Sequence, residues 1–329
     1  MFTLRVDDKI VGVMSSNVDD LLYGSLPGHE QAMEDVLDRF DVRDRSETSF
    51  RFCGKEVFQH DDFSIAVTAK DNTEKIRPIE IGIQRRAGDK CTADETTSLR
   101  SVVASLAWVA RQVRPDLSYR VSKLQSVAGN GLVKDMRECN KVLEYAQDKS
   151  DEGLYFASEG ISWDDCVVCT ITDASFCNET VYIDGFPEPG RSQQGYIVCL
   201  APAGILNMDQ AIIHPISHGS THIKRVCRAT LMAETFAMIK GTEAGTRIRA
   251  AMVDMKGKLD MRNWEETSAN EMGHCWMTDC DSLFEHLMTQ RLNSIENKRL
   301  AIDLMALRQQ IWERSGERTL EIDHSYGDY

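Results

Sequence analysis

The sequence predicts an α/β (α+β) fold, with a mixed five-stranded sheet and flanking helices in the second half and a mostly helical region before it. In the first half, apolar residues recur with helical spacing, most clearly over residues 96–128,. In the second half, three short apolar runs joined by turns are followed by alternating helical and strand-like segments. Such an order is typical of an antiparallel meander extended by parallel strands.

At 329 residues the chain has the length of about two domains,. A polar stretch with a single tryptophan, Ser158–Asp165, separates helical from strand-like patterning,. We therefore predict one domain over residues 1–160 and a second over residues 161–329.

The first region is expected to open with a β-hairpin over residues 9–22, with Asp19 and Asp20 at its tip. Neighbouring side chains on a strand point to opposite faces, so only one of these acids can face a given site directly. The alternative to a functional role for the two acids is an ordinary acidic turn. Pro115 interrupts the longest helix, and Asp116 is expected to cap the next one,. Helices are expected over 28–40, 70–76, 96–128 and 135–147, with short strands between 41 and 83 and at 153–156.

The second region is expected to contain five strands, three helices and two irregular segments. The strands are expected over 167–172, 195–200, 211–217, 275–278 and 320–322, and the helices over 228–249, 282–289 and 298–314,. A loop rich in glycine and proline is expected over 184–190, and a polar insertion over 256–273,.

Three isolated acids, Asp173, Glu234 and Asp279, interrupt apolar segments of this second region. Asp173 and Asp279 end predicted strands, and Glu234 lies in a predicted helix. A buried carboxylate is costly without a cation or a donor, so the three acids are candidate ligands for a pair of divalent cations. The alternative for Asp173 is a strand-terminating residue that starts a turn.

The formal net charge of −14 argues against a nucleic-acid-binding protein, because such proteins normally present a basic surface,. Local basic clusters weaken this objection, and we single out Lys224, Arg225 and Arg228. Ten cysteines without framework spacing favour free thiols in a reducing compartment,. A zinc site at His214, His218 and His222 lacks a suitably spaced cysteine pair,.

No apolar run is long enough to span a bilayer, and the N-terminal residues lack a secretory pattern,. We therefore expect an intracellular protein of the cytoplasm or nucleus with no membrane partner.

Several stretches resemble the Pol polyprotein of copia-type LTR retrotransposons, in the same order. NVDDLL at residues 17–22 resembles the YVDDLL palm hairpin of reverse transcriptases, and SLRSVVASLAWVARQVRPDLSYRVSKL resembles a later reverse transcriptase stretch of these elements. TDASF, RATLMAE, TDCDSLFEHL and NKRLAIDLMALRQ resemble their RNase H block. The resemblance covers nearly the whole chain and implies the end of a reverse transcriptase, with its palm end and connection, followed by a domain of the RNase H fold.

The resemblance also implies functional residues. Asp173, Glu234 and Asp279 would be catalytic metal ligands for two Mg²⁺ or Mn²⁺ ions that support hydrolysis of the RNA strand of RNA–DNA hybrids. Asp19 and Asp20 would be the paired palm carboxylates of a vestigial polymerase site. The remaining palm acid is expected in polymerase segments upstream of residue 1, so these segments are expected partners and no polymerase activity is expected from this chain. The family carries a further C-terminal acid, for which Asp323 and Asp328 are the candidates.

A degenerate, non-catalytic transposon remnant or a nucleic-acid-binding module is the main alternative to an active nuclease. An ordinary metabolic α/β enzyme finds no support, because the sequence has no strand-GxGxxG-helix unit, no GxSxG elbow and no HExxH motif,.

Overall fold

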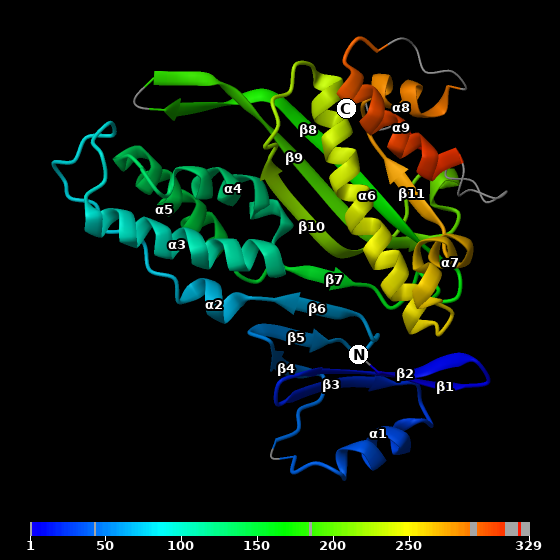
Figure 1. Ribbon diagram of the computed structural model, residues 1–329. Coiled ribbons are helices and arrows are strands. Elements are labelled where there is room, and N and C mark those ends of the chain that lie inside the picture. The colour runs from blue at the N-terminus through cyan, green and yellow to red at the C-terminus, as the bar shows by residue number, and fades with distance from the viewer. Residues whose placement is uncertain (1, 43, 184–185, 290–294, 313–321, 324–329) are drawn as a thin grey trace.

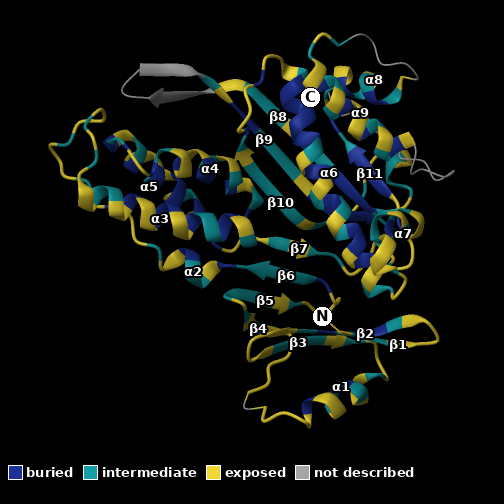
Figure 2. Ribbon diagram, viewed as in Figure 1, coloured by how far each residue is buried: buried dark blue, intermediate teal, exposed yellow. Residues whose placement is uncertain are grey.

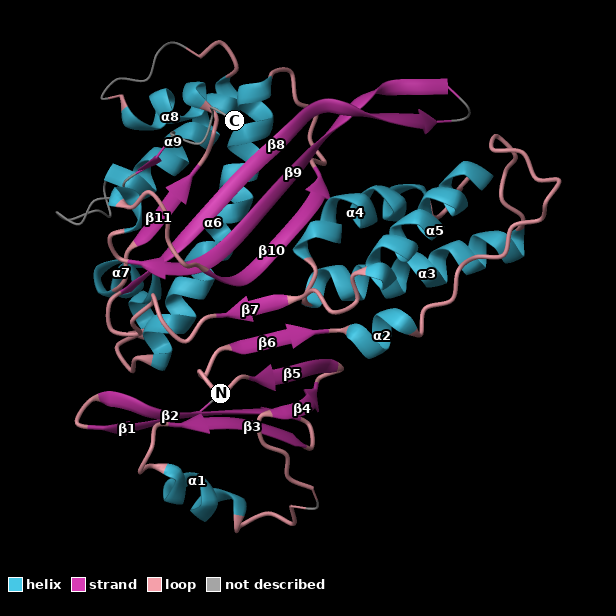
Figure 3. Ribbon diagram, turned by 180° about the vertical axis from the view of Figure 1, so that it is seen from behind, coloured by secondary structure: helices cyan, strands magenta, loops and turns pink. Residues whose placement is uncertain are grey.

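The structure is a computed structural model that describes residues 2–42, 44–183, 186–289, 295–312 and 322–323. Its described part is a mixed α/β protein with three separate sheets (Figure 1). The mixed α/β class predicted from the sequence is therefore confirmed. Seen from behind, the largest sheet lies beside a group of helices, and the two smaller sheets follow at one end (Figure 3).

The first sheet is antiparallel and contains β1 (Phe2–Val6), β2 (Lys9–Asn17) and β3 (Asp20–Ser25), in that order. Helix α1 (Glu30–Leu37) covers it with its apolar side, where Met33 and Leu37 are buried.

The second sheet is also antiparallel and has the strand order β4 (Ser49–Phe52), β5 (Lys55–Gln59), β6 (Ile65–Thr68) and β7 (Leu154–Phe156). Helices separate β6 from β7 along the chain: α2 (Lys70–Glu74), α3 (Ala93–Gln112), the short η1 (Pro115–Leu117), α4 (Ser118–Val127) and α5 (Val133–Asp148). The apolar sides of these helices form one core, which includes Leu99, Leu106, Leu117, Met136 and Leu143.

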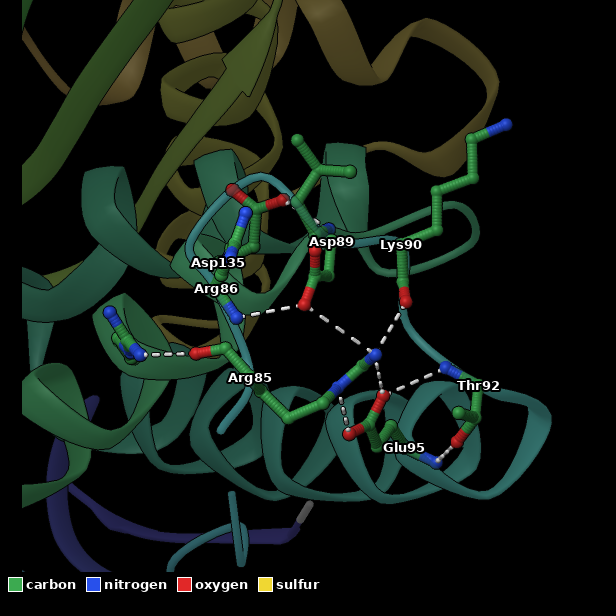
Figure 4. A network of polar contacts seen from close by, with 9 residues as sticks. Arg85, Arg86, Asp89, Lys90, Thr92, Glu95 and Asp135 are labelled. Atoms are coloured by element: carbon green, nitrogen blue, oxygen red, sulfur yellow. Dashed lines mark hydrogen bonds and ion pairs between the residues drawn. The ribbon is translucent and has the colours of Figure 1, made fainter. Parts of the chain in front are cut away.

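A network of polar contacts fixes the loop that leads into α3 (Figure 4). Thr92 and Glu95 form a capping box, in which each side chain accepts a hydrogen bond from the backbone N–H of the other residue,. Arg85 pairs with Glu95 at 2.7 Å and also donates to the carbonyl oxygen of Lys90 at 2.6 Å. The loop is thus tied to the first turn of the longest helix in this half.

The third sheet has five strands in the order β10-β9-β8-β11-β12. Strands β8 (Cys166–Ile183), β9 (Phe186–Pro202) and β10 (His214–His222) are antiparallel neighbours. Strands β11 (His274–Met277) and β12 (Ile322–Asp323) then continue the sheet parallel to β8. The mixed five-stranded sheet predicted from the sequence is present.

Helix α6 (Thr230–Met255) lies across one face of this sheet (Figure 1). Gly241 and Gly245 let the helix approach closely, because a Cβ atom at Gly241 would lie only 2.5 Å from Cγ2 of Thr172,. Three further helices pack near α6: α7 (Trp264–Glu271), α8 (Asp281–Met288) and α9 (Lys298–Trp312). The short η3 (Met261–Asn263) precedes α7, and η2 (Ile205–Asn207) packs against strand residues of the sheet, among them Cys169 and Cys199.

Three sequence predictions about elements are wrong. The loop expected over 184–190 is largely strand, because β9 already begins at Phe186; residues 184–185 lie outside the described part. Asp116 does not cap α4, since its carboxylate binds the buried Arg114 at 2.8 Å. The first region is not mostly helical, because it carries two sheets. The polar insertion predicted at 256–273 contains helix α7, an element that the sequence pattern did not indicate.

The two halves of the chain are in direct contact. Nε2 of His218, on β10, lies 2.8 Å from the carbonyl oxygen of Ala110 on α3. Nε2 of Gln193, on β9, donates to Oγ of Ser122 on α4 at 3.1 Å. Arg5, on β1, donates to the carbonyl oxygen of Met255 at the end of α6, at 2.6 Å.

None of the helices in the described part of the chain has a stretch long and apolar enough to cross a bilayer.

Candidate metal centre

Parallel pairing of β8 and β11 brings Asp173 and Asp279 to the same level of the sheet. Ile171 of β8 pairs with Met277 of β11, and each aspartate follows its strand residue by two positions. Neighbouring strands of a sheet lie about 4.8 Å apart, so side chains at equal positions on β8 and β11 can meet. Both aspartates are exposed at this edge.

Helix α6 supplies the third carboxylate from above the sheet. Glu234 lies near the start of α6 and is only 4% exposed. Its Oε1 accepts a hydrogen bond of 3.2 Å from the backbone N–H of Ala174, the residue after Asp173. Its Oε2 is buried and has no hydrogen-bond partner among the described residues. One oxygen of Glu234 is therefore free to bind a ligand.

One carboxylate oxygen from each of Asp173, Glu234 and Asp279 lies within 4.8 Å of the other two. Among the described residues, these three form the single cluster of at least three His, Cys, Asp or Glu side chains with this geometry. The convergence predicted from the sequence is thus confirmed, whereas metal binding stays a prediction.

Burial and neighbouring carboxylates disfavour the ionised forms of Glu234 and Asp173. Burial raises the pKa of Glu234 to about 8, and repulsion from Asp173 and Asp279 adds to this effect,. Desolvation also raises the pKa of Asp173, with a further contribution from Asp279. A divalent cation would reverse this preference, because it favours the ionised form of each ligand.

The chemistry of the cluster suits a hard divalent cation. Three carboxylates offer only oxygen atoms, which Mg²⁺ and Mn²⁺ prefer over nitrogen or sulfur. The buried and unpartnered Oε2 of Glu234 fits the same interpretation, because a bound cation would compensate the cost of burying that atom,. The residues present could therefore hold a metal ion.

Two glycines that were not predicted from the sequence as contact residues seat α6 against the sheet. Gly241 and Gly245 face Thr170 and Thr172 of β8. Glu234 lies on the same side of α6, nearer the start of the helix,. A Gly-x-x-x-Gly spacing in a predicted helix was the available signal, since two glycines one turn apart allow another element to approach closely.

Asp19 and Asp20 lie apart from this cluster, at the turn between β2 and β3. Asp20 pairs with Asn17 across the hairpin, and Val18 takes a positive φ of 54° in the turn. Both acids are exposed, and within the described residues neither joins a three-ligand group. The hairpin predicted from the sequence is present.

Lys224, Arg225 and Arg228 are exposed in the segment between β10 and α6. Arg225 is partly engaged, because its guanidinium lies 3.3 Å from Asp303 of α9 and 5.1 Å from the centre of the Phe236 ring. Phosphate binding by these cations stays a prediction.

Neither candidate for a fourth acid can be placed at the centre. Asp323 pairs with Met277 through the backbone of β12, and Asp328 lies outside the described residues.

The histidines of β10 do not form a zinc site. Residues four apart on a strand are separated by about 13 Å, so His214, His218 and His222 cannot share one ion.

A scan of protein-family models and a search of curated proteins found no match to this chain.

Proposed function

We propose that this chain is the reverse transcriptase end and RNase H domain of a copia-type LTR retrotransposon, and that its second half hydrolyses the RNA strand of RNA–DNA hybrids with two Mg²⁺ or Mn²⁺ ions. The observation that carries the proposal is the convergence of Asp173, Glu234 and Asp279 within 4.8 Å. These are the residues that the resemblance assigns to the nuclease site.

The sheet topology supports the proposed RNase H fold. Three antiparallel strands are followed by two strands parallel to the central one, and the acids come from the central strand, the long helix and the end of the fourth strand. That order of elements and acids resembles the RNase H fold, which the sequence resemblance also implies.

Each residue of the centre has a definite task in this proposal. Asp173, Glu234 and Asp279 would hold the ions, and the N–H of Ala174 orients Glu234. When bound, such ions lower the pKa of water and offset the charge of the phosphodiester during hydrolysis. Glu234 must release its proton for this, because its pKa of about 8 keeps it largely neutral at pH 7.

Lys224 and Arg228 are the cations to which the proposal assigns phosphate binding. Both are exposed in the segment that leads into α6, which carries Glu234. A plot of the logarithm of the hybrid-binding constant against the logarithm of the salt concentration has a negative slope. Replacing either residue by alanine should make this slope shallower by about one unit.

The direct experiment is cleavage of a labelled RNA–DNA hybrid by the purified chain in Mn²⁺. We expect Asp173→Asn and Asp279→Asn each to lower the rate by more than about 100-fold, because each removes a metal ligand. The double variant Asp19→Asn/Asp20→Asn is the matched control and should cleave like the parent.

Two results would contradict the nuclease proposal. Equal cleavage by Asp173→Asn and the parent would trace the activity to a contaminant. A folded parent chain that binds Mn²⁺ but leaves the hybrid intact would favour the non-catalytic remnant.

A further inference from the structure

The outer face of the second sheet carries an exposed group of aromatic side chains. Phe58 of β5 pairs with Ala66 of β6, which pairs with Tyr155 of β7, so these three side chains share one face of the sheet,. The next residues along β6 and β7, Val67 and Leu154, point to the opposite face of the sheet and pack against the helical core. Phe58 and Tyr155 therefore point away from that core, and exposed segments appear on β5 and β7 in Figure 2.

Two residues of the turn between β5 and β6 adjoin them, and we call the four residues together the aromatic patch: Phe58, His60, Phe63 and Tyr155. The ring of His60 lies 4.6 Å from that of Phe58, edge to face at 80°, and 6.3 Å from that of Tyr155. His60 thus lies between the rings of the two strand residues. Phe63 is held close to His60, since its N–H donates to the His60 carbonyl oxygen at 2.9 Å.

These rings remain in contact with solvent. The exposed fractions are 46% for Phe58, 71% for Phe63 and 53% for Tyr155. Single exposed apolar residues are ordinary, but several rings gathered on one face are typical of an interaction surface. Because aromatic residues also contribute disproportionately to binding energy, the patch is suited to hold a partner.

Two carboxylates give the patch its charge. Asp61 and Asp62 lie between His60 and Phe63 and are both exposed. In the part of the chain that the structure describes, neither forms an ion pair with lysine or arginine. Asp62 accepts hydrogen bonds from the N–H and the hydroxyl of Ser64, which hold its pKa below the usual value. The carboxylate is therefore ionised at neutral pH.

Charge and ring geometry together select one kind of partner. Ionised carboxylates beside the rings, in a chain of net charge −14, repel the phosphates of a nucleic acid,. An arginine guanidinium can bind both the rings and the carboxylates, because it stacks on aromatic faces and pairs with carboxylates through two hydrogen bonds. A lysine ammonium lacks the planar shape that this combination needs.

We propose that the aromatic patch is a docking site for an arginine-rich segment of a protein partner. Phe58 and Tyr155 provide the stacking surfaces, and Asp61 pairs with a guanidinium. The site is formed by the first half of the chain and uses none of the three carboxylates of the candidate metal centre.

The test is fluorescence anisotropy with a labelled oligoarginine peptide, compared with an oligolysine peptide of equal length and with single-stranded oligothymidylate. We expect oligoarginine to bind at least about 3-fold more tightly than oligolysine. Phe58→Ala and Tyr155→Ala should each weaken oligoarginine binding by about 3- to 10-fold, in line with a cation–π contact. Asp61→Asn should weaken it as well without removing an apolar side chain.

The control is Phe40→Ala, which removes an exposed ring outside the patch and should leave binding unchanged. Equal binding of oligoarginine and oligolysine would overturn the proposal, because attraction to the net charge alone treats both peptides alike. Binding of oligoarginine that is unchanged in the patch variants would overturn it too. Oligothymidylate binding that is abolished in Tyr155→Ala would replace the proposed partner with a single-stranded nucleic acid.

Discussion

A carboxyl group that is buried beside two other carboxylates is most stable in its neutral form, and Glu234 is in that position,. The sequence could predict the three acids, because each interrupts an apolar segment where an unpaired charge is costly. It could not predict that Ala174 donates to Glu234, or that one oxygen of Glu234 has no partner in the described structure. Those facts depend on the position of α6 relative to β8, which a single sequence does not contain.

Without metal, stability should fall as the pH rises from 6.5 to 8. Unfolded Glu234 loses its proton near pH 4.5, whereas folded Glu234 keeps it until about pH 8. The folded state therefore binds more protons in this window, and rising pH favours unfolding by about 1–2 kcal/mol. Buried His274, whose pKa is lowered to about 3, acts in the opposite direction, with most of its effect below pH 6.5 and a smaller part at the start of this window,.

The measurement is urea unfolding in EDTA at pH 6.5 and at pH 8. Glu234→Gln should remove most of the difference in the free energy of unfolding between the two pH values, because the amide does not titrate. Glu243 is an exposed residue of the same helix, and the control variant Glu243→Gln should show the same pH difference as the parent. A stability that rises over this pH window in the parent, or a slope unchanged in Glu234→Gln, would contradict this expectation.

Helix α6 shows what a sequence predicts well about an element and what it does not. The apolar pattern predicted a helix over 228–249, and the structure has it over Thr230–Met255. The pattern did not indicate the contact of Gly241 with Thr172, because that contact depends on the sheet. Likewise, the period-2 pattern located β8 and β9 but not their length, since Gly190 and two prolines suggested a loop.

Gly241→Ala should destabilise the fold although alanine favours helices. The new Cβ would meet Thr172 at 2.5 Å and Thr170 at 2.8 Å, so the helix must shift away from the sheet. We expect a net destabilisation of about 1–3 kcal/mol, against a helix propensity gain of up to about 1 kcal/mol. Because the shift moves Glu234 relative to Asp173, stabilisation by Mn²⁺ should also weaken.

Thermal melts with and without Mn²⁺ test this expectation. Lys240→Ala changes the neighbouring, exposed position of α6 and should retain both the stability and the metal response of the parent. A Gly241→Ala variant more stable than the parent would show that the helix is not held by close contact with the sheet.

At the scale of the whole molecule, the contacts between distant segments were the least predictable. Strand β7 pairs with β6 although three long helices separate them in the sequence. The apolar pattern at 153–156 predicts a strand but does not indicate which strand it pairs with. The first sheet reaches the second half of the chain through Arg5, which donates to the last carbonyl groups of α6. A cation at a helix C-terminus is favourable because it opposes the negative end of the helix dipole.

Arg5→Ala should lower the stability of the chain by about 0.5–1.5 kcal/mol, because it removes hydrogen bonds between a charged donor and backbone oxygens at an exposed site,. Chemical denaturation measures this change. Lys9→Ala, at an exposed position of β2, is the control and should have little effect. An Arg5→Ala variant as stable as the parent would show that this contact does not hold the two halves together.

Calorimetric titration of the purified chain with Mn²⁺ would establish whether Asp173, Glu234 and Asp279 form a site for divalent cations. We predict saturable binding with proton release near pH 7, since Glu234 must ionise,. Asp173→Asn and Asp279→Asn should abolish this binding, while Asp19→Asn/Asp20→Asn should retain it. No saturable binding by the parent, or the same binding in Asp173→Asn, would contradict the assignment of the metal centre and with it the proposed nuclease.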